Sequence, residues 1–261
     1  MKRRSLRELI RDRAKKQGWY DSPEYWDMKA RTYSGLARSN WPSNSYNEHV
    51  HARQMRTLDN LLGDVTGQQI AEIGCGTGRA CRHLAKRGAT VTGWDFAPEA
   101  LNAARRESEE EGLSISFHVG NVMAEPDAAF HQTFDVVMTL GCLTLACKSR
   151  SEFEAAVGHL KKLLKPGGRM LFLEPIHRSR LLRRILRLSM EEWIASCTDQ
   201  GLTLIDRGGV CFVPSRFALA YFDMPRPFVE RVFDAGESVL DASAVFERLA
   251  DYKYLVFRLP A

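Results

Sequence analysis

The sequence lacks the features that would mark it as a membrane, secreted or metal-stapled protein. No apolar run approaches the eighteen or so residues of a membrane-spanning helix, and no apolar signal-peptide core follows the basic start. The 6 cysteines include no CxxC pair, so their spacing indicates neither a zinc site nor a disulfide framework. Internal repeats and low-complexity segments are also missing. We therefore expect a soluble, unexported, cytoplasmic protein with small buried thiols.

Positive charge is in slight excess and gathers at one end. The 261 residues are 44% hydrophobic and 26% charged, which is the composition of one catalytic-size globular domain with appendages. The first 17 residues carry eight Lys or Arg against two Asp or Glu, a net charge of +6, whereas the whole chain carries +5. The remaining residues are therefore close to neutral, which argues against a broadly basic surface for nucleic acid.

From about residue 69, short apolar runs alternate with amphipathic patterns, as in a parallel sheet covered by helices on both faces. The predicted strands are 69–73, 90–94, 114–118, 134–138, 169–174, 202–213 and 252–259. Predicted helices cover 46–62, 78–88, 98–111, 151–164, 190–199 and 227–239. The pattern predicts an α/β, Rossmann-like fold with a seven-stranded, mostly parallel sheet whose last strand inserts antiparallel.

Residues 1–45 differ from the rest of the chain. A basic, helix-like start leads into aromatic residues separated by Ser, Asn and Pro, namely Trp19, Tyr20, Tyr25, Trp26, Tyr33 and Trp41. These aromatics either pack an appendage onto the domain or form a helical lid over substrate or cofactor, and both roles are compatible. We expect an appendage over 1–45, with Trp26 and Tyr33 as candidate substrate contacts, and the main domain over 46–261.

The strongest motif runs from Ala71 to Arg79 and contains three closely spaced glycines at the end of a predicted strand. Glycines let the backbone turn sharply and approach a ligand, and the helix that follows offers free N–H groups. A dinucleotide fingerprint would need a glycine where Arg79 stands. The spacing therefore disfavours NAD.

The motif Glu72-x-Gly74-x-Gly76-x-Gly78 resembles motif I of the class I S-adenosylmethionine-dependent methyltransferases, and the resemblance extends over about residues 65–175. It implies S-adenosylmethionine as the cofactor. The positions that it places against the cofactor are Glu72, Gly74, Cys75, Gly76, Gly78, Asp95, Phe96, Asn121, Val122, Leu140 and Gly141.

Within that set the resemblance gives Asp95 both ribose hydroxyls, and the alternative for Asp95 is a helix N-cap before Pro98. Asn121 stands where many members carry aspartate, and it implies a weaker, uncharged contact to the adenine edge. Gly141 falls where the family's backbone lines the sulfur end of the cofactor, and a small residue there leaves space for an acceptor.

Candidate catalytic residues follow the fifth predicted strand. His177 has the chemistry to take a proton from a hydroxyl near neutral pH, with Glu174 orienting it or holding substrate. The alternative is that His177 simply caps the strand end or is exposed. His49 and His51 are weaker candidates for the same role.

An arginine-rich connector over 178–187 is either an amphipathic helix facing water or a contact for an anionic acceptor, with Arg178 and Arg180 as candidate substrate-binding residues.

The sequence contains neither an Asn/Asp-Pro-Pro-Tyr/Phe motif nor a Pro-Cys dipeptide. It also shows no second pair of carboxylates that would hold a metal ion, so we expect no metal. The stretches Glu174–His177 and Asp251–Lys253 resemble methyltransferases of glycan and secondary-metabolite pathways.

The resulting prediction is an O-methyltransferase that acts on a small molecule, glycan-related or from secondary metabolism. Two alternatives keep the same fold: an RNA or protein methyltransferase, and a non-catalytic S-adenosylmethionine-binding module.

Overall fold

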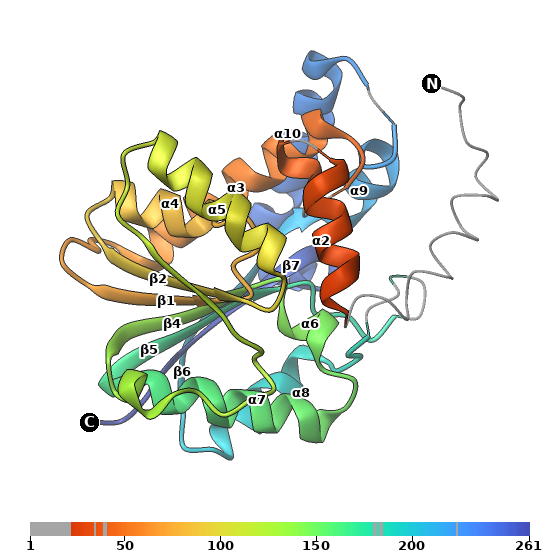
Figure 1. Cartoon of the computed structure of the whole chain (residues 1–261). Helices are drawn as coiled ribbons and strands as arrows, with labels where there is room; N and C mark the ends of the chain where they lie inside the picture. Colours follow the sequence, from red (N-terminus) through yellow and green to blue (C-terminus); the bar gives the residue numbers. More distant parts are fainter. Residues whose placement is uncertain (1–21, 34, 39–40, 180–181, 183–184, 223) are drawn as a thin grey trace.

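The computed structural model describes residues 22–261 except 34, 39–40, 180–181, 183–184 and 223 (Figure 1). Its centre is a seven-stranded sheet in the order β3-β2-β1-β4-β5-β7-β6. The strands are β1 (Gln69–Ile73), β2 (Thr90–Asp95), β3 (Ser116–Val119), β4 (Phe134–Leu140), β5 (Leu164–Glu174), β6 (Thr203–Phe212) and β7 (Ala250–Arg258). The first five strands pair in parallel, and β7 is antiparallel to both β5 and β6. The predicted fold class is confirmed.

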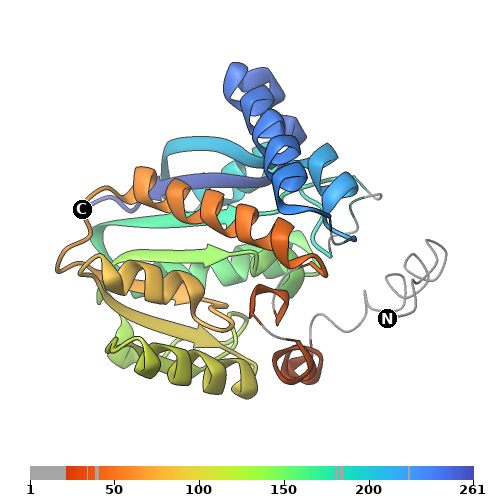
Figure 2. The same cartoon turned by 90° about the horizontal axis from the view of Figure 1, so that it is seen from above.

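Helices cover both faces of the sheet (Figures 1 and 2). One face carries α3 (Asn44–Leu62), α4 (Arg79–Lys86), α5 (Pro98–Glu110) and α10 (Arg226–Ala242), and the other carries α6 (Leu143–Ala146), α7 (Arg150–Leu163) and α8 (Met190–Thr198). The helix α7 shows why such segments form: Ser149 caps its first turn, and Phe153, Val157 and Leu160 recur at helical spacing on its buried face.

Three features of the fold were not predicted. The strand β5 begins at Leu164 rather than 169, because Leu164 already pairs with Phe134 of β4 before the Pro-Gly turn. The apolar run over 202–213 forms the strand β6 as far as Phe212, but the helix α9 (Val213–Leu219) that follows it directly, with Pro214 near its start, was not predicted. The four-residue helix α6 is too short to produce a periodic pattern.

The appendage contributes α2 (Pro23–Thr32) and the short 3-10 helix η1 (Gly35–Arg38), and two further 3-10 helices, η2 (Ala128–Phe130) and η4 (Ala244–Leu249), lie later in the chain. The helix α2 packs on the start of α5, where Asp27 Oδ1 accepts a hydrogen bond from the Glu99 N–H at 2.9 Å and Arg31 pairs with Glu99. The basic segment 1–17, Trp19 and Tyr20 lie outside the described residues.

Of the arginine-rich connector, the described residues do not form a regular amphipathic helix. Leu182 and Leu186 are buried, while Arg178 and Arg187 are exposed. The connector is therefore anchored by its leucines, and its described arginines face outward. Among the residues that the structure describes, no helix is long and apolar enough to cross a membrane.

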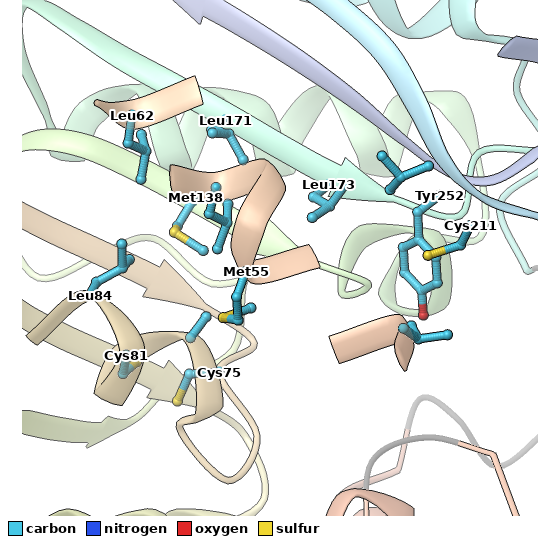
Figure 3. Close-up of a cluster of buried hydrophobic side chains, with 14 of the residues drawn as sticks. Met55, Leu62, Cys75, Cys81, Leu84, Met138, Leu171, Leu173, Cys211 and Tyr252 are labelled. Atoms are coloured by element: carbon cyan, nitrogen blue, oxygen red, sulfur yellow. The ribbon is translucent and has the colours of Figure 1, made fainter. Parts of the chain in front are cut away.

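Two apolar clusters fill the space between the sheet and its helices. Figure 3 shows part of the first, with Cys75 and Cys81 at one end and Cys211 and Tyr252 at the other. In the second, the fully buried Trp193 packs against Phe153 and Phe172, with ring centroids 4.2 Å and 5.5 Å apart.

We expect Trp193→Ala to lower the free energy of unfolding by about 3–5 kcal/mol, because it removes the largest side chain of this cluster and leaves a cavity. Phe222→Ala, which removes a ring that is 51% exposed, should change it by no more than about 0.5 kcal/mol. Urea unfolding of both variants measures the difference. Equal effects would contradict this view of the core.

Candidate functional site

The glycine loop between β1 and α4 presents backbone to open space. Gly74, Gly76 and Gly78 have φ values of 76°, 55° and 70°, a region that side chains rarely allow. A Cβ on Gly74 would overlap the side chain of Cys142, whereas one on Gly76 would meet no atom within 4 Å. The helix α4 begins at Gly78 without a side-chain cap, so its first N–H groups remain available for a polar ligand.

Asp95, at the end of β2, holds this loop. Its Oδ2 accepts a hydrogen bond from the Gly76 N–H at 2.8 Å, and its Oδ1 accepts one from Ala97 N–H at 2.9 Å. Burial raises the pKa of Asp95, while these backbone donors oppose that shift. Each oxygen still has a second lone pair, so the carboxylate retains the capacity for the two hydroxyls that the resemblance gives it. The alternative, a local turn before α5, describes only the Ala97 contact.

Glu72 lies deeper than a ligand contact requires. The side chain is buried, and its Oε2 accepts a hydrogen bond from the Cys81 thiol of α4 at 2.9 Å. Burial raises the pKa of Glu72 to about 7, although the Cys81 thiol and the charge of Arg79 act in the opposite direction. In this structure Glu72 links β1 to α4 beneath the loop.

Glu72→Gln should alter how stability depends on pH. The pKa of Glu72 is about 7 in the folded chain and about 4.3 in the unfolded chain, so the unfolded chain releases this proton first as the pH rises. As the pH rises through this range the group lowers the free energy of unfolding, by up to about 4 kcal/mol. The variant lacks this loss, so its stability relative to the parent should increase from about pH 5 to about pH 8 in urea unfolding. Parallel pH curves for the two proteins would contradict the assignment.

The predicted adenine side lies after β3. Asn121 is exposed, and its Oδ1 accepts a hydrogen bond from the Met123 N–H at 2.9 Å, while Val122 is buried and Phe96 is half-buried. The Asn121 carbonyl oxygen thus shapes its own turn, with one lone pair left for a ligand.

The predicted sulfur end lies after β4, where Leu140 is half-buried and Gly141 has a φ of 71°. The Gly141 N–H donates to the Leu173 carbonyl at 3.1 Å, which fixes the turn against β5. A Cβ on Gly141 would lie 3.8 Å from the ring of Tyr252. Tyr252, on β7, therefore borders this position, and no role was predicted for this side chain.

Glu174 does not orient His177. Its fully buried carboxylate accepts five hydrogen bonds from the end of β4 and the chain that follows: from the hydroxyls of Thr139 and Thr144 and from the backbone N–H groups of Cys142, Leu143 and Thr144. Burial raises the pKa of Glu174, and these donors oppose that shift. The expected catalytic role is corrected to a structural one, because the carboxylate fastens α6 and the Gly141 turn to β5.

His177 is buried and pairs with a residue that sequence reasoning did not assign. Its Nε2 lies 3.0 Å from the backbone oxygen and 3.4 Å from Oδ1 of Asp251, at the start of β7. Asp251 Oδ1 in turn pairs with Nη1 of Arg216 on α9, and both side chains are fully buried. The Asp251-Tyr252-Lys253 triplet drew attention in the sequence, but nothing local indicated its partners.

The rival histidines are placed differently. His51 Nδ1 lies 2.9 Å from the guanidinium of Arg79 and must accept its hydrogen, because arginine only donates. Burial and then the charge of Arg79 lower the pKa of His51 to about 4. His49 Nδ1 donates to the Ser45 carbonyl at 2.8 Å. The basic nitrogen of His51 is thus already engaged by Arg79.

The expected substrate contacts are spread around the site. Trp26 of α2 is half-buried, with Lys29 Nζ 5.5 Å from its ring centroid, and Tyr33, directly after α2, is 42% exposed. Arg178 is exposed, with Glu192 4.0 Å away. Arg180 lies outside the described residues.

The carboxyl edge of β1, β2 and β4 therefore fits an S-adenosylmethionine-like ligand. It offers a loop free of side chains at Gly76, a carboxylate with spare lone pairs at Asp95, and a small residue at Gly141. Within the described ranges, no three His, Cys, Asp or Glu side chains gather in a way that would hold a metal ion.

Comparison with known proteins agrees with this description. Residues 70–168 match the family model of a methyltransferase domain. The ubiquinone biosynthesis O-methyltransferase of Actinobacillus pleuropneumoniae serotype 5b (strain L20) is 29% identical over 153 residues, which cover 56% of this chain and 63% of that protein. The demethylmenaquinone methyltransferase of Tropheryma whipplei (strain Twist) is 30% identical over 145 residues, 55% and 56% of the two chains. The chain thus matches less than two thirds of the length of these relatives.

Solved structures show the same fold. An N-methyltransferase of Bradyrhizobium japonicum WM9 in complex with S-adenosyl-L-homocysteine has a TM-score of 0.62 at 18% identity, covering 92% of this chain and 100% of that one. A [4+2]-cyclase has a TM-score of 0.59 at 21% identity, covering 85% and 86%. The fold therefore accommodates more than one reaction.

The sheet order and the glycine loop define a Rossmann-like domain that binds S-adenosylmethionine. The match over residues 70–168 identifies this part of the chain as a methyltransferase domain, and it supports the resemblance to the class I S-adenosylmethionine-dependent methyltransferases, whose cofactor is S-adenosylmethionine.

Asp95→Ala should abolish measurable binding of S-adenosylhomocysteine, because it removes the ribose acceptor and releases the Gly76 and Ala97 N–H groups. A hydrogen bond to a charged group contributes about 1.5–3 kcal/mol, so the expected loss is at least about tenfold per bond. Asp95→Asn should bind with intermediate affinity, and the exposed Asp64→Asn should bind normally in calorimetry. Tight binding by Asp95→Ala would contradict the assignment of the cofactor site.

Proposed function

We propose that the protein is an S-adenosylmethionine-dependent methyltransferase that methylates a hydroxyl of a small-molecule acceptor. The observation that carries this proposal is the buried His177–Asp251 pair beside the turn at Gly141. Tyr252 connects the two places, since it follows Asp251 in β7 and its ring borders Gly141. The O-methyltransferase name of one set of relatives supports the same reaction class.

In this proposal the loop of Gly74, Gly76 and Gly78 together with Asp95 holds the cofactor, and Gly141 leaves room at its sulfur end. When bound, S-adenosylmethionine supplies an electrophilic methyl group. The chain itself aligns the acceptor hydroxyl, removes its proton at His177, and excludes water with the ring of Tyr252.

The appendage over 1–45 is proposed to act as a lid. Its support is the position of α2, where Asp27 caps the start of α5 immediately after Asp95 and Phe96. Trp26 lies on α2 and Tyr33 at its end, so they are proposed to contact the acceptor from this side. Figure 2 shows the helices seen from above.

Glycan-related compounds and secondary metabolites, the acceptor classes indicated by the sequence, both offer such hydroxyls. The exposed Arg178 supports an anionic acceptor. A panel of hydroxylated small molecules, with and without carboxylate or phosphate groups, tests this by measuring S-adenosylhomocysteine formation. Turnover with RNA or protein alone, together with an affinity for that acceptor that falls steeply as salt is added, would support a macromolecular acceptor. Cofactor binding without turnover on any acceptor would support a non-catalytic module.

His177→Ala should leave S-adenosylhomocysteine affinity within about twofold, since His177 is not among the expected cofactor contacts, and should reduce methylation by about 10²–10⁴-fold, the usual contribution of a general base. The control is His49→Ala. His49 is a candidate base that, unlike His51, does not contact an arginine, and its removal should leave turnover unchanged. Unchanged turnover in His177→Ala would overturn the base assignment.

A further inference from the structure

A buried polar cluster lies where β5, β7, α3 and α9 meet. It consists of His177, Asp251, Arg216 and Tyr46, each no more than 7% exposed. Removing so many polar groups from water is costly unless each is paired. Yet the Tyr46 hydroxyl and the Nε and Nη2 atoms of Arg216 have no hydrogen-bond partner within the described part of the chain. Buried polar atoms that have no hydrogen-bond partner are typical of functional sites.

The contacts of His177 determine which ring nitrogen carries hydrogen. A backbone carbonyl oxygen only accepts hydrogen bonds, so the Asp251 oxygen 3.0 Å from Nε2 requires Nε2 to be the donor. The Asp251 carboxylate, at 3.4 Å, lies on the same nitrogen. In the neutral ring the basic lone pair therefore lies on Nδ1.

Arg216 fixes the carboxylate that faces His177. Its Nη1 pairs with the same Oδ1, and its guanidinium lies between the rings of Trp41 and Phe217, 5.2 Å and 5.0 Å from their centroids. Burial acts to lower the pKa of Arg216, but the neighbouring Asp251 raises it, so Arg216 stays charged. The Asp251 side chain is thus held in one orientation by a cation that cannot lose its proton.

We propose that Asp251 is a positioning residue that holds His177 as the Nε2–H tautomer and strengthens Nδ1 as a base, and that Arg216 positions Asp251. This inference rests on the proposed role of His177. As the acceptor's O–H bond breaks, its proton forms the new N–H bond at Nδ1, and the positive charge on the ring lies against the Asp251 carboxylate. The arrangement follows the logic by which a carboxylate orients and stabilises a catalytic imidazole.

Other titratable groups also interact electrostatically with Asp251, so their charges affect the same carboxylate. Among the described residues these are Tyr46 on α3, Cys211 on β6, Arg216 on α9 and Lys253 on β7. Tyr46 and Cys211 have raised pKa values, chiefly through burial, so both remain neutral near pH 7. Burial lowers the pKa of Lys253 to about 8.

The test is nitrogen-15 NMR of the His177 ring in the full-length protein without acceptor. The parent should show hydrogen on Nε2. Asp251→Asn should lower the pKa of His177 by about one unit or more, because it removes an adjacent negative charge. The acid limb of the pH profile of kcat/KM should move by the same amount. Asp206→Asn, which alters an exposed carboxylate on β6, should move neither.

A Nδ1–H tautomer, or a His177 pKa that is unchanged in Asp251→Asn, would overturn the inference. If Asp251→Asn does not fold because Arg216 is left uncompensated, the double variant Asp251→Asn/Arg216→Met removes both charges and is measured instead. Its His177 pKa should still lie below that of the parent, and an equal value would also overturn the inference. The NMR measurement needs no turnover. It therefore tests the role of Asp251 separately from the proposed function, which fails if His177→Ala does not slow methylation.

Discussion

The antiparallel pairing of β7 with β5 is the constraint on which the candidate site depends. Its register places Glu174 opposite Lys253 and Leu173 opposite Tyr254. The chain that leaves the carboxyl end of β5 therefore meets the chain that enters β7, and His177 comes to lie against Asp251, 74 residues later. The same strand brings Tyr252 to Gly141. If β7 ran parallel to β5, its other end, with Arg258, would lie beside the carboxyl end of β5 in place of Asp251.

The sequence could bring together the positions expected to hold the cofactor, because their signals are local. The glycine loop and Gly141 follow a strand directly, Asp95 ends one, and parallel strands end at one edge of the sheet. The contacts around the proposed base could not be predicted, because the Arg216–Asp251 and His177–Asp251 contacts join distant segments whose charges look ordinary in sequence. The role of Glu174 was misjudged for a related reason: an acidic residue at a strand end resembles a ligand contact until the short α6, which it caps, is visible.

Several polar groups near the site are held at a cost to stability. Glu72 and Glu174 are buried with raised pKa values, and three buried polar atoms of Tyr46 and Arg216 have no hydrogen-bond partner in the described structure. Apolar replacements would relieve these costs. These groups lie around one edge of the sheet: Glu72 supports the loop, Glu174 supports the Gly141 turn, and Arg216 supports the proposed base.

In the proposed reaction, His177 removes the proton of the acceptor hydroxyl. This role is tested by the distance from His177 Nδ1 to the acceptor oxygen in a crystal structure with S-adenosylhomocysteine and an acceptor identified by turnover. We expect hydrogen-bond contact, about 2.6–3.2 Å, with the oxygen facing the cofactor sulfur. An acceptor oxygen that faces the sulfur but lies beyond the reach of His177, directly or through one water, would contradict it.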